Sequence, residues 1–323
     1  MTFEQILGHQ SQKEILRRAL ASDRLAHAYL FEGPEGIGKR LMALGVARAV
    51  FCSRGTGCGD CVACRKVDHH NHPDLHLLEV EGTSIKIDQV RELQQSLSLR
   101  PLEAKKKICL INGAEYLNPA AGNALLKTLE EPPGDALIIL LSAHPDRLLS
   151  TIRSRCQRLP FRRLQRDVLQ QVLQQQLGIG DAESHVLSAL AEGSFKKAFG
   201  KDRRLYLEQR RELLRELTAL TGGAVLPRFE FAEKLAGQKE QLQEILGIFQ
   251  TFFRDLLLHK HGRPENEWVN LDLREKIERV ARLETEESLL LKLDALAATR
   301  LRLERNVNRQ LAMEVLLQRL APS

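Results

Sequence analysis

The pattern of hydrophobic and polar positions divides the chain near residue 160. Before that point, short apolar runs alternate with helix-like segments, and the clearest runs lie at 28–32, 75–80, 107–112 and 136–142. Turn or helix signals bound each of these runs. Such alternation is typical of βαβ units around a parallel sheet. We therefore predict an α/β domain with a parallel sheet over residues 1–162.

The remainder of the chain is helical in pattern almost throughout. Leucines and valines recur at three- and four-residue spacing, first over 168–177 and then over 186–190. Gly193, Gly200 and the charged run 201–204 then indicate a boundary. The pattern predicts two further domains: a small helical lid domain, residues 163–205, and an all-α helical bundle, residues 206–323.

Glycine and proline interrupt the predicted bundle at Gly222, at Gly223 and again over 261–264. Leucines such as Leu311, Leu316 and Leu320 form stripes along its helices. We interpret these stripes as bundle core, which is their more common role, and not as a special binding groove. A bundle of this kind also offers a surface for assembly.

Length and composition indicate a multi-domain protein without membrane segments. The 323 residues correspond to two or three domains, and 43% of them are hydrophobic while 28% are charged. No apolar run approaches the roughly 18 residues of a membrane span. The first residues include the acidic Glu4, where a signal peptide would have a basic segment. We expect a cytoplasmic protein, and its net charge of +6 permits contact with nucleic acid without demonstrating it.

A phosphate-binding sequence follows the first predicted strand. Residues 33–39 read Gly-Pro-Glu-Gly-Ile-Gly-Lys, a G-x-x-x-x-G-K loop that precedes a helix-forming segment. Gly33, Gly36 and Gly38 allow backbone N–H groups to point at phosphate oxygens, and Lys39 adds a positive charge. An ordinary glycine turn is the alternative, but strand, loop, lysine and helix together favour a nucleotide site.

Three requirements of magnesium-assisted hydrolysis are absent around this loop. Arg40 occupies the position of the Ser or Thr that would ligate Mg²⁺. The strand at 107–112 should end in an acidic pair, but it ends in Asn112 and Gly113. Glu115 follows, and we expect it to point elsewhere. We therefore expect no intrinsic ATPase activity, while nucleotide binding by the degenerate loop stays open.

Four of the six cysteines lie close together and predict a metal site. Their spacing contains two C-x-x-C steps, which suit tetrahedral Zn²⁺ better than a secreted disulfide framework: Cys52, Cys58, Cys61 and Cys64. Four thiolates leave no open position, so a structural role is favoured over a catalytic one. An Fe–S cluster is an alternative, although nothing else in the chain suggests redox chemistry. Nearby histidines are alternative ligands that we expect to be surface loop residues instead: His69, His70, His72 and His76.

A basic segment follows the last predicted strand, and it contains Arg153, Arg155 and Arg158. Taken alone, an arginine-rich helix end is usually a solvated face or a partner of the helix dipole. Its place after the strand that would carry the phosphate-sensing residue of an ATPase favours a trans-acting role for Arg155. A guanidinium can contact γ-phosphate oxygens in the transition state, so Arg155 is a candidate arginine finger for a neighbouring subunit.

Together these features resemble the clamp-loader branch of the AAA+ ATPases. The matching stretches cover nearly all of the first 160 residues: 3–10, 24–31, the cysteine module with 72–74, 123–133 and 154–156. The run at 123–133, Asn-Ala-Leu-Leu-Lys-Thr-Leu-Glu-Glu-Pro-Pro, is highly specific to this family, and Ser154-Arg155-Cys156 is its arginine-finger motif. The match weakens afterwards. Lys196 lies in a segment similar to sensor 2, where an ATPase member carries arginine, and 306–308 is similar to the start of the closing collar helix.

The resemblance implies a heteropentameric bacterial clamp loader that acts in DNA replication. Its gamma/tau motor subunits bind ATP, its delta subunit opens the sliding clamp, and primer-template DNA enters the central chamber. This chain would be the comparatively rigid, non-catalytic end piece, with 206–323 as its collar domain. An ATP-hydrolysing motor subunit tolerant of Arg40 is the alternative, although such a subunit would keep the hydroxyl and the acidic pair. A zinc-dependent DNA-binding protein is a third interpretation.

Overall fold

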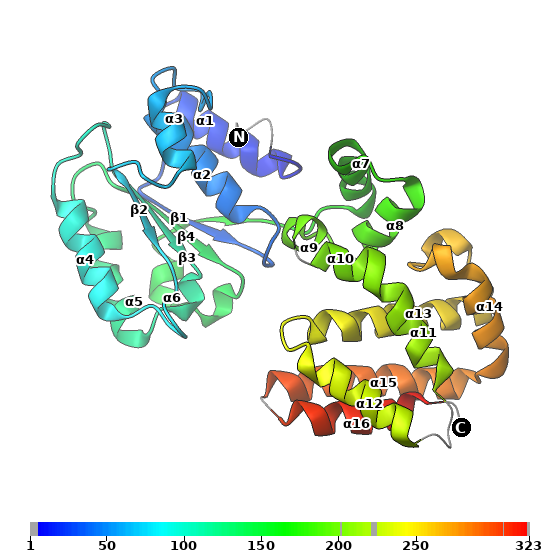
Figure 1. Ribbon diagram of the computed structural model, residues 1–323. Helices are drawn as coiled ribbons and strands as arrows, with labels where there is room; N and C mark the ends of the chain where they lie inside the picture. Colours follow the sequence, from blue (N-terminus) through cyan, green and yellow to red (C-terminus); the bar gives the residue numbers. More distant parts are fainter. Residues whose placement is uncertain (1–5, 201, 221–224, 306, 322–323) are drawn as a thin grey trace. The chain divides into compact units, whose positions relative to one another are not determined.

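The computed structural model describes residues 6–200, 202–220, 225–305 and 307–321 (Figure 1). The chain forms two compact units, Met1–Leu164 and Gln165–Ser323. Several positions singled out in the sequence lie outside the described residues: Phe3, Glu4, Gln5, Lys201, Gly222, Gly223 and Asn306.

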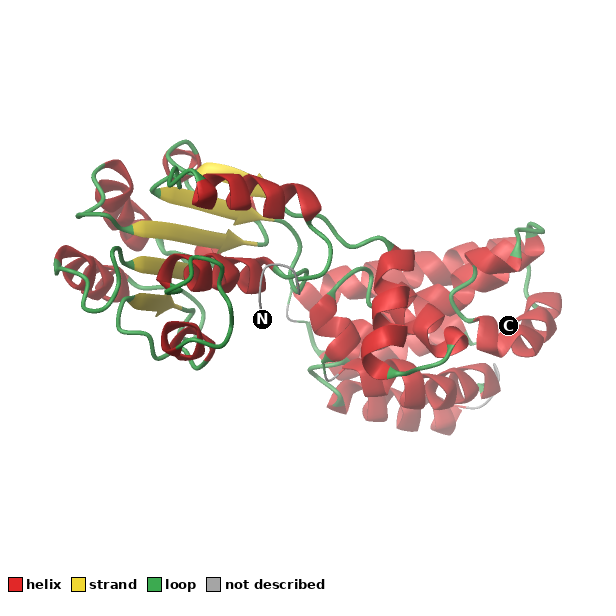
Figure 2. Cartoon of the chain, turned by 90° about the horizontal axis from the view of Figure 1, so that it is seen from above, coloured by secondary structure: helices red, strands yellow, loops and turns green. Residues whose placement is uncertain are grey.

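The first unit contains a parallel sheet with helices on both faces (Figure 2). The strand order is β2-β3-β4-β1-β5, and every described pairing is parallel. The strands are β1 Ala28–Glu32, β2 Leu75–Leu78, β3 Ile108–Asn112, β4 Leu137–Ser142 and β5 Gln157–Pro160. The four predicted strands are confirmed, with β2 ending two residues earlier than expected.

Each face of the sheet has its own hydrophobic core because successive side chains of a strand point to opposite faces. In β1, Tyr29 and Phe31 belong to one core, while Ala28 and Leu30 belong to the other. Residues of α1 and α2 complete the first core, and residues of α4 and α5 complete the second. The helices are α1 Gln10–Ala21, α2 Lys39–Phe51, α3 Val62–Asp68, α4 Ile87–Ser98, η2 Ala114–Tyr116, α5 Pro119–Glu130, η3 Pro145–Arg147 and α6 Ser150–Arg153.

The edge strand β5 corrects the expectation of an arginine-rich helix end. The helix α6 ends at Arg153, and the chain then enters β5, whose Gln157 is in register with Tyr29 of β1. Only Leu159 of this strand is buried, so its sequence lacks the apolar run that marks the other strands. Pro160 ends it, a position that an edge strand tolerates.

Because the strands are parallel, all their carboxyl ends lie along one side of the sheet and all their amino ends along the opposite side. We call these sides the carboxyl edge and the amino edge; neither is the lateral edge formed by the edge strands β2 and β5. At the carboxyl edge, the loops after β1, β3 and β4 emerge beside one another. At the amino edge lie the segments that lead into β3, β4 and β5. In parallel α/β sheets, ligands bind outside the carboxyl ends of the strands, so the loop after β1 occupies the expected nucleotide position.

The second unit is entirely helical over its described residues, as predicted. Its helices are α7 Arg166–Leu177, α8 Asp181–Leu190, α9 Phe195–Phe199, α10 Asp202–Arg204, η4 Leu205–Gln209, α11 Arg210–Ala219, α12 Val225–Gly237, α13 Leu242–Lys260, η5 Glu265–Glu267, η6 Leu271–Leu273, α14 Arg274–Leu283, α15 Glu286–Glu304 and α16 Arg309–Leu320. None of the helices in the described ranges has the length and apolar character needed to cross a bilayer.

One predicted core residue of this unit is exposed. Leu316 and Leu320 are buried in α16 as expected, but Leu311 is 59% exposed. The buried stripe of this helix instead contains Met313 together with Leu317. Positions 313, 316, 317 and 320 share one helical face, whereas 311 is five residues from 316 and projects from another side.

A buried ion pair holds the start of α11 against η6. Arg210 donates from Nη2 to both carboxylate oxygens of Asp272, at 2.7 and 2.6 Å, and from Nε to the carbonyl of Tyr206. Its Nη1 donates to Asn270, which is itself held by Asp255. Burial acts to raise the pKa of Asp272, but hydrogen bonds and charges from Arg210 and Arg211 lower it overall. Nearly all polar atoms of this buried cluster therefore have partners.

The Arg210–Asp272 pair yields a prediction with an internal control. Arg210 is 2% exposed, whereas Arg211 bonds the same carboxylate from a side chain that is 61% exposed. Arg210→Met leaves buried acceptors unpaired and should lower the free energy of unfolding by about 3–5 kcal/mol. Arg211→Met should cost about 1 kcal/mol or less because solvent screens that pair. Urea unfolding of both variants tests this, and equal losses would contradict it.

Candidate functional site

The phosphate loop adopts the backbone conformation that its glycines permit. Gly33, Gly36 and Gly38 have φ angles of 144°, 77° and 105°, a region that disfavours other residues. A Cβ on Gly33 would lie 2.2 Å from the carbonyl oxygen of Phe161, so this position has no room for a side chain. Gly38 is the N-cap of α2. The loop therefore places a helix N-terminus at the carboxyl edge of the sheet, a favourable place for an anion.

Lys39 points back into this loop. The side chain is 8% exposed, and its Nζ donates to the carbonyl oxygens of Gly33 and Pro34, the latter at 2.7 Å. Burial lowers the pKa of Lys39, while Glu115 and Glu35 act in the opposite direction. The charge that would bind a phosphate is thus satisfied by the chain itself.

The neighbours of the loop do not supply a magnesium site. The Nη2 of Arg40 lies 2.9 Å from the carboxylate of Glu79, in an ion pair just beyond β2. Asn112 ends β3 with an amide in place of a carboxylate. A cation and an amide therefore stand where the Mg²⁺ ligands of a hydrolase are required.

Glu115 occupies the turn η2 after β3. Its Oε1 accepts a hydrogen bond of 2.9 Å from the backbone N–H of Ala143 after β4. Its charge also acts to raise the pKa of Lys39. The expectation that Glu115 does not replace the missing acidic pair stays a prediction.

Arg155 lies at the other edge of the sheet, between α6 and β5. Its Nη2 is 2.5 Å from Oε1 of Glu130, and its Nη1 donates to the carbonyl of Thr151 at 3.1 Å. About a third of the side chain is exposed. Gln157, the first residue of β5, is in register with Tyr29, four residues before Gly33, or roughly 13 Å at about 3.3 Å per residue. Arg155 precedes Gln157 and pairs with Glu130 at the end of α5, so its guanidinium is held away from the phosphate loop of its own chain.

Lys196, the other residue assigned to nucleotide, lies in the second compact unit. It is exposed on the short helix α9, which begins at the N-cap Ser194. Gly200 ends this helix, and a Cβ there would lie 2.2 Å from the carbonyl oxygen of Lys196. The part that Lys196 plays at the nucleotide stays a prediction.

The four clustered cysteines are brought together as the sequence predicts. Their sulfur atoms all lie within 4.8 Å of one another, with Cys52 Sγ 3.6 Å from Cys58 Sγ and 4.0 Å from Cys61 Sγ. Tetrahedral thiolates around one metal ion would be about 3.8 Å apart, given metal–sulfur bonds of about 2.3 Å. All four are free cysteines. Cys52, Cys58, Cys61 and Cys64 can therefore hold one metal ion with a complete sulfur shell.

Backbone N–H groups donate hydrogen bonds to sulfur atoms of this cluster and so stabilise the thiolate form. Burial acts to raise the pKa of Cys52, but N–H groups of Cys58 and Arg54 contribute to lowering it to about 5. Cys64 is different, since burial raises its pKa to about 12. The N–H of Cys64 itself donates to Cys61 Sγ at 3.5 Å. Such N–H contacts are the outer-shell support expected around metal-bound thiolates.

The cysteine module is fixed to the helix of the phosphate loop. Cys52 directly follows α2, and the buried Arg48 of α2 forms an ion pair with the exposed Asp68 of α3. His72 is 3% exposed and stacks on Phe51, with ring centroids 4.0 Å apart. This corrects the expectation that His72 is a surface loop residue, because its ring stacks on Phe51. His76 is likewise not a loop residue, since it lies partly buried within β2, whereas His69 and His70 are exposed as expected. The sulfur cluster contains no histidine among the described residues.

Asp74 holds a loop at the amino edge through hydrogen bonds, a role that its sequence did not predict. Its carboxylate accepts from the backbone N–H groups of Leu102, Glu103 and Ala104, at 2.7, 2.8 and 2.8 Å. Burial acts to raise the pKa of Asp74, but these hydrogen bonds lower it overall. The stretch 72–74, His-Pro-Asp, belongs to the family resemblance, but the N–H groups that donate to Asp74 lie about 30 residues further along the chain. No local sequence motif therefore indicates this role of Asp74.

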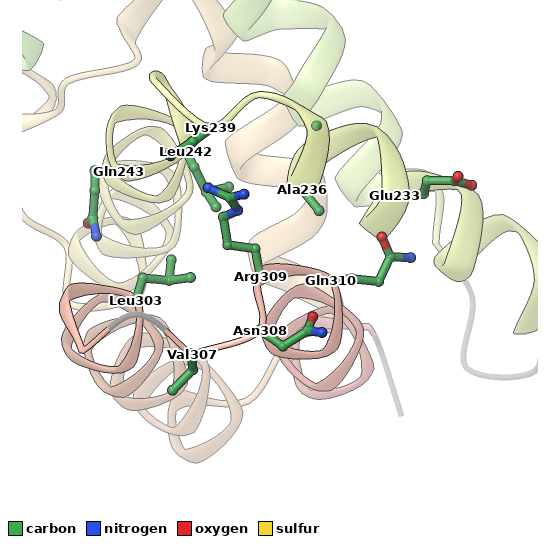
Figure 3. A pocket seen from close by; sticks show the side chains of 11 residues that line it. Glu233, Ala236, Lys239, Leu242, Gln243, Leu303, Val307, Asn308, Arg309 and Gln310 are labelled. Carbon is green, nitrogen blue, oxygen red and sulfur yellow. The ribbon is translucent and has the colours of Figure 1, made fainter.

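A cavity of about 780 Å³ lies among α12, α13, α15 and α16 of the second unit (Figure 3). Arg309 extends from the start of α16 toward Leu242 and Lys239 (Figure 3). Glu233 is the one carboxylate among the described residues that line it. Among these lining residues a single carboxylate has no second acid or base beside it, so they do not indicate an acid–base site.

Comparison with known proteins identifies close relatives along the whole chain. The family described as DNA polymerase III, delta subunit matches residues 8–165, and its C-terminal counterpart matches residues 205–321. A DNA polymerase III subunit delta' from Bacillus subtilis is 34% identical over 312 residues, covering 94% of this chain and 93% of the relative. Subunit delta' from Pseudomonas aeruginosa is 45% identical over 136 residues, covering 41% and 42%.

More distant similarity extends to other subunits of the same polymerase. A DNA polymerase III subunit tau from Bacillus subtilis is 31% identical over 205 residues, covering 61% of this chain and 36% of the relative. A solved structure of a gamma subunit-related protein from Thermotoga maritima aligns with a TM-score of 0.50 and 18% identity, covering 94% and 97%. At this identity, the structural likeness concerns the fold alone.

The Asp74 carboxylate yields a pH-dependent prediction. Asp74→Asn should lower the free energy of unfolding at pH 7 by about 1.5–3 kcal/mol, because it weakens hydrogen bonds to a charged acceptor. The folded pKa of Asp74 is lowered, so its stabilisation is present above the unfolded pKa of about 3.9 and is lost as pH falls through the folded value. Urea unfolding at pH 7 and pH 3 should show the deficit shrinking in acid. The exposed Asp88→Asn is the control, and a deficit independent of pH would argue against this account.

Proposed function

The chain belongs to the DNA polymerase III delta-prime subunit family, and on that premise we propose that it is the non-catalytic stator of a bacterial clamp loader. In this role it supplies Arg155 in trans, as an arginine finger, to the nucleotide of an adjacent ATPase subunit. The assembled complex loads the sliding clamp onto primed DNA.

The observation that carries this proposal is the separation of the two candidate nucleotide elements within one chain. The phosphate loop lies at the carboxyl edge of the sheet, and Arg155 lies near the amino end of β5. The loop has Arg40 and Asn112 where hydrolysis requires Mg²⁺ ligands. A chain that retains an outward arginine but lacks its own metal ligands is suited to act on the nucleotide of a neighbour.

The partners in this proposal follow from the family. They are the gamma/tau motor subunits and the delta subunit within a heteropentamer, with the sliding clamp and primer-template DNA engaged through the complex, in the cytoplasm. Residues 163–205 act as the lid and residues 206–323 as the collar that joins the ring. Gly33, Gly36, Gly38, Lys39 and Arg40 form the degenerate phosphate loop, and Lys196 is assigned to the nucleotide by the family resemblance alone. Lys39 bonded to its own loop supports weak nucleotide affinity.

We also propose that the cysteine module holds a structural Zn²⁺ ion. An all-cysteine shell suits zinc, and it leaves no open position for catalysis. The module's attachment to α2 and its buried neighbour His72 support a structural role, because metal binding would fix the segment that follows the phosphate-loop helix.

The arginine finger is tested by Arg155→Ala in a clamp loader reconstituted with its motor, delta and clamp partners. Loss of a γ-phosphate-contacting arginine costs about a thousandfold or more at the site it serves. In a heteropentamer of this chain, delta and three motor subunits, silencing one site while the other two stay intact should lower the clamp- and DNA-stimulated ATPase by roughly a third. Assembly should be unchanged by gel filtration, because Arg155 makes only partly exposed contacts in its own chain.

Arg153→Ala serves as the matched control. Arg153 lies two residues before Arg155 and carries the same charge, but it pairs with Asp146 instead of Glu130. An unchanged stimulated ATPase in Arg155→Ala would refute the finger assignment. ATP turnover by the isolated chain that is abolished by Lys39→Ala would instead identify a self-sufficient motor subunit.

The zinc proposal is tested by Cys58→Ser. The purified variant should contain less than one zinc ion per chain by elemental analysis and should be less soluble, because a thiolate ligand is lost. Cys109→Ser is a cysteine control outside the cluster, and it should retain full zinc. Iron with sulfide in the wild-type protein, or full zinc in Cys58→Ser, would contradict the assignment.

A further inference from the structure

The segment around Arg155 is anchored so that its arginine projects from the protein. Ile152 and Cys156 are buried in the core between the sheet, α4 and α5. Burial also raises the pKa of Cys156 to about 12, so its thiol is neutral and packs as an apolar group. Ser154 Oγ and Arg155 Nη1 both donate to the carbonyl of Thr151, each at 3.1 Å. The backbone position of Arg155 is therefore set from both sides.

The outer end of the guanidinium is fixed by a different element. Glu130 is the last residue of α5, and its Oε1 lies 2.5 Å from Arg155 Nη2. The carboxyl end of a helix carries partial negative charge, which adds to the attraction for a cation. A guanidinium has five N–H donors. The bonds to Thr151 and Glu130 use two of them, which leaves three for a phosphate.

This ion pair is poorly placed to stabilise the fold. The side chain of Glu130 is 50% exposed and that of Arg155 is 36% exposed, so water screens their attraction. The consequence of the contact is instead geometric, because a long side chain that would otherwise sample many rotamers is held at two of its nitrogens. An arginine finger acts through the position of its charge relative to the γ-phosphate, and small misplacements lower the rate steeply.

We propose that Glu130 is the positioning residue of the arginine finger: it holds the Arg155 guanidinium in place before the partner's nucleotide arrives. This inference rests on the proposed trans role of Arg155. It adds a second element, the end of α5, to the surface that serves the neighbouring subunit. Glu130 touches no nucleotide in this scheme and acts only through Arg155.

The test compares Glu130→Ala with Glu131→Ala in the reconstituted clamp loader. Glu131 is the adjacent, exposed carboxylate, so its removal makes the same change in charge at the same helix end. Glu130→Ala should lower the clamp- and DNA-stimulated kcat by up to the loss seen in Arg155→Ala, roughly a third, as expected for a loosened catalytic group at one site. The KM for ATP should stay unchanged, because the nucleotide is bound by the partner. Glu131→Ala should behave as the wild-type protein.

The double variant Glu130→Ala/Arg155→Ala separates positioning from a general structural effect. If Glu130 acts through Arg155, the double variant should be no slower than Arg155→Ala alone. Additive losses, or a normal kcat in Glu130→Ala while Arg155→Ala is slow, would overturn the positioning role and leave the finger intact. A normal kcat in Arg155→Ala would instead refute the proposed function itself. Wild-type melting temperatures and co-elution with the partners establish that each variant folds and assembles.

Discussion

The structure depends on one constraint, which is the common direction of the five strands. Because all of them run parallel, the phosphate loop after β1 and the segment before β5 emerge at opposite edges of the sheet. Arg155 and the phosphate loop therefore lie near opposite ends of the strands. Under the proposed function, this separation suits head-to-tail assembly, in which the loop of one subunit meets the arginine of the next.

Several cations at the two edges have partners within the chain. At the carboxyl edge, Lys39 bonds loop carbonyls and Arg40 pairs with Glu79, so neither cation is left for Mg²⁺-dependent chemistry. At the amino edge, Arg155 is bonded on one side and keeps donors for another ligand. Cations at both edges thus have partners within the chain, while the Arg155 guanidinium retains further N–H donors.

Local patterns in the sequence were sufficient where burial is continuous or spacing is short. The apolar runs predicted four strands, and the short C-x-x-C steps predicted the cysteine cluster. Strand β5 was missed because an edge strand with one buried residue has no apolar run. Asp74, Glu115 and Glu130 owe their roles to partners 25 or more residues away, which periodicity and motif spacing do not encode. Leu311 shows the converse error, since a leucine counts as core only on the face that the neighbouring helices cover.

The cysteine module and the arginine segment both belong to locally fixed parts of the first unit. The module is held to α2 by the Arg48–Asp68 ion pair. The segment that follows it contains His72 and Asp74, and Asp74 bonds the loop ahead of β3. That loop lies at the same edge of the sheet as Arg155. A metal ion there would stiffen the framework of the amino edge while contacting no nucleotide. Under the proposed trans role of Arg155, such rigidity favours the reaction, because a group held in position before assembly loses little freedom when the neighbour binds.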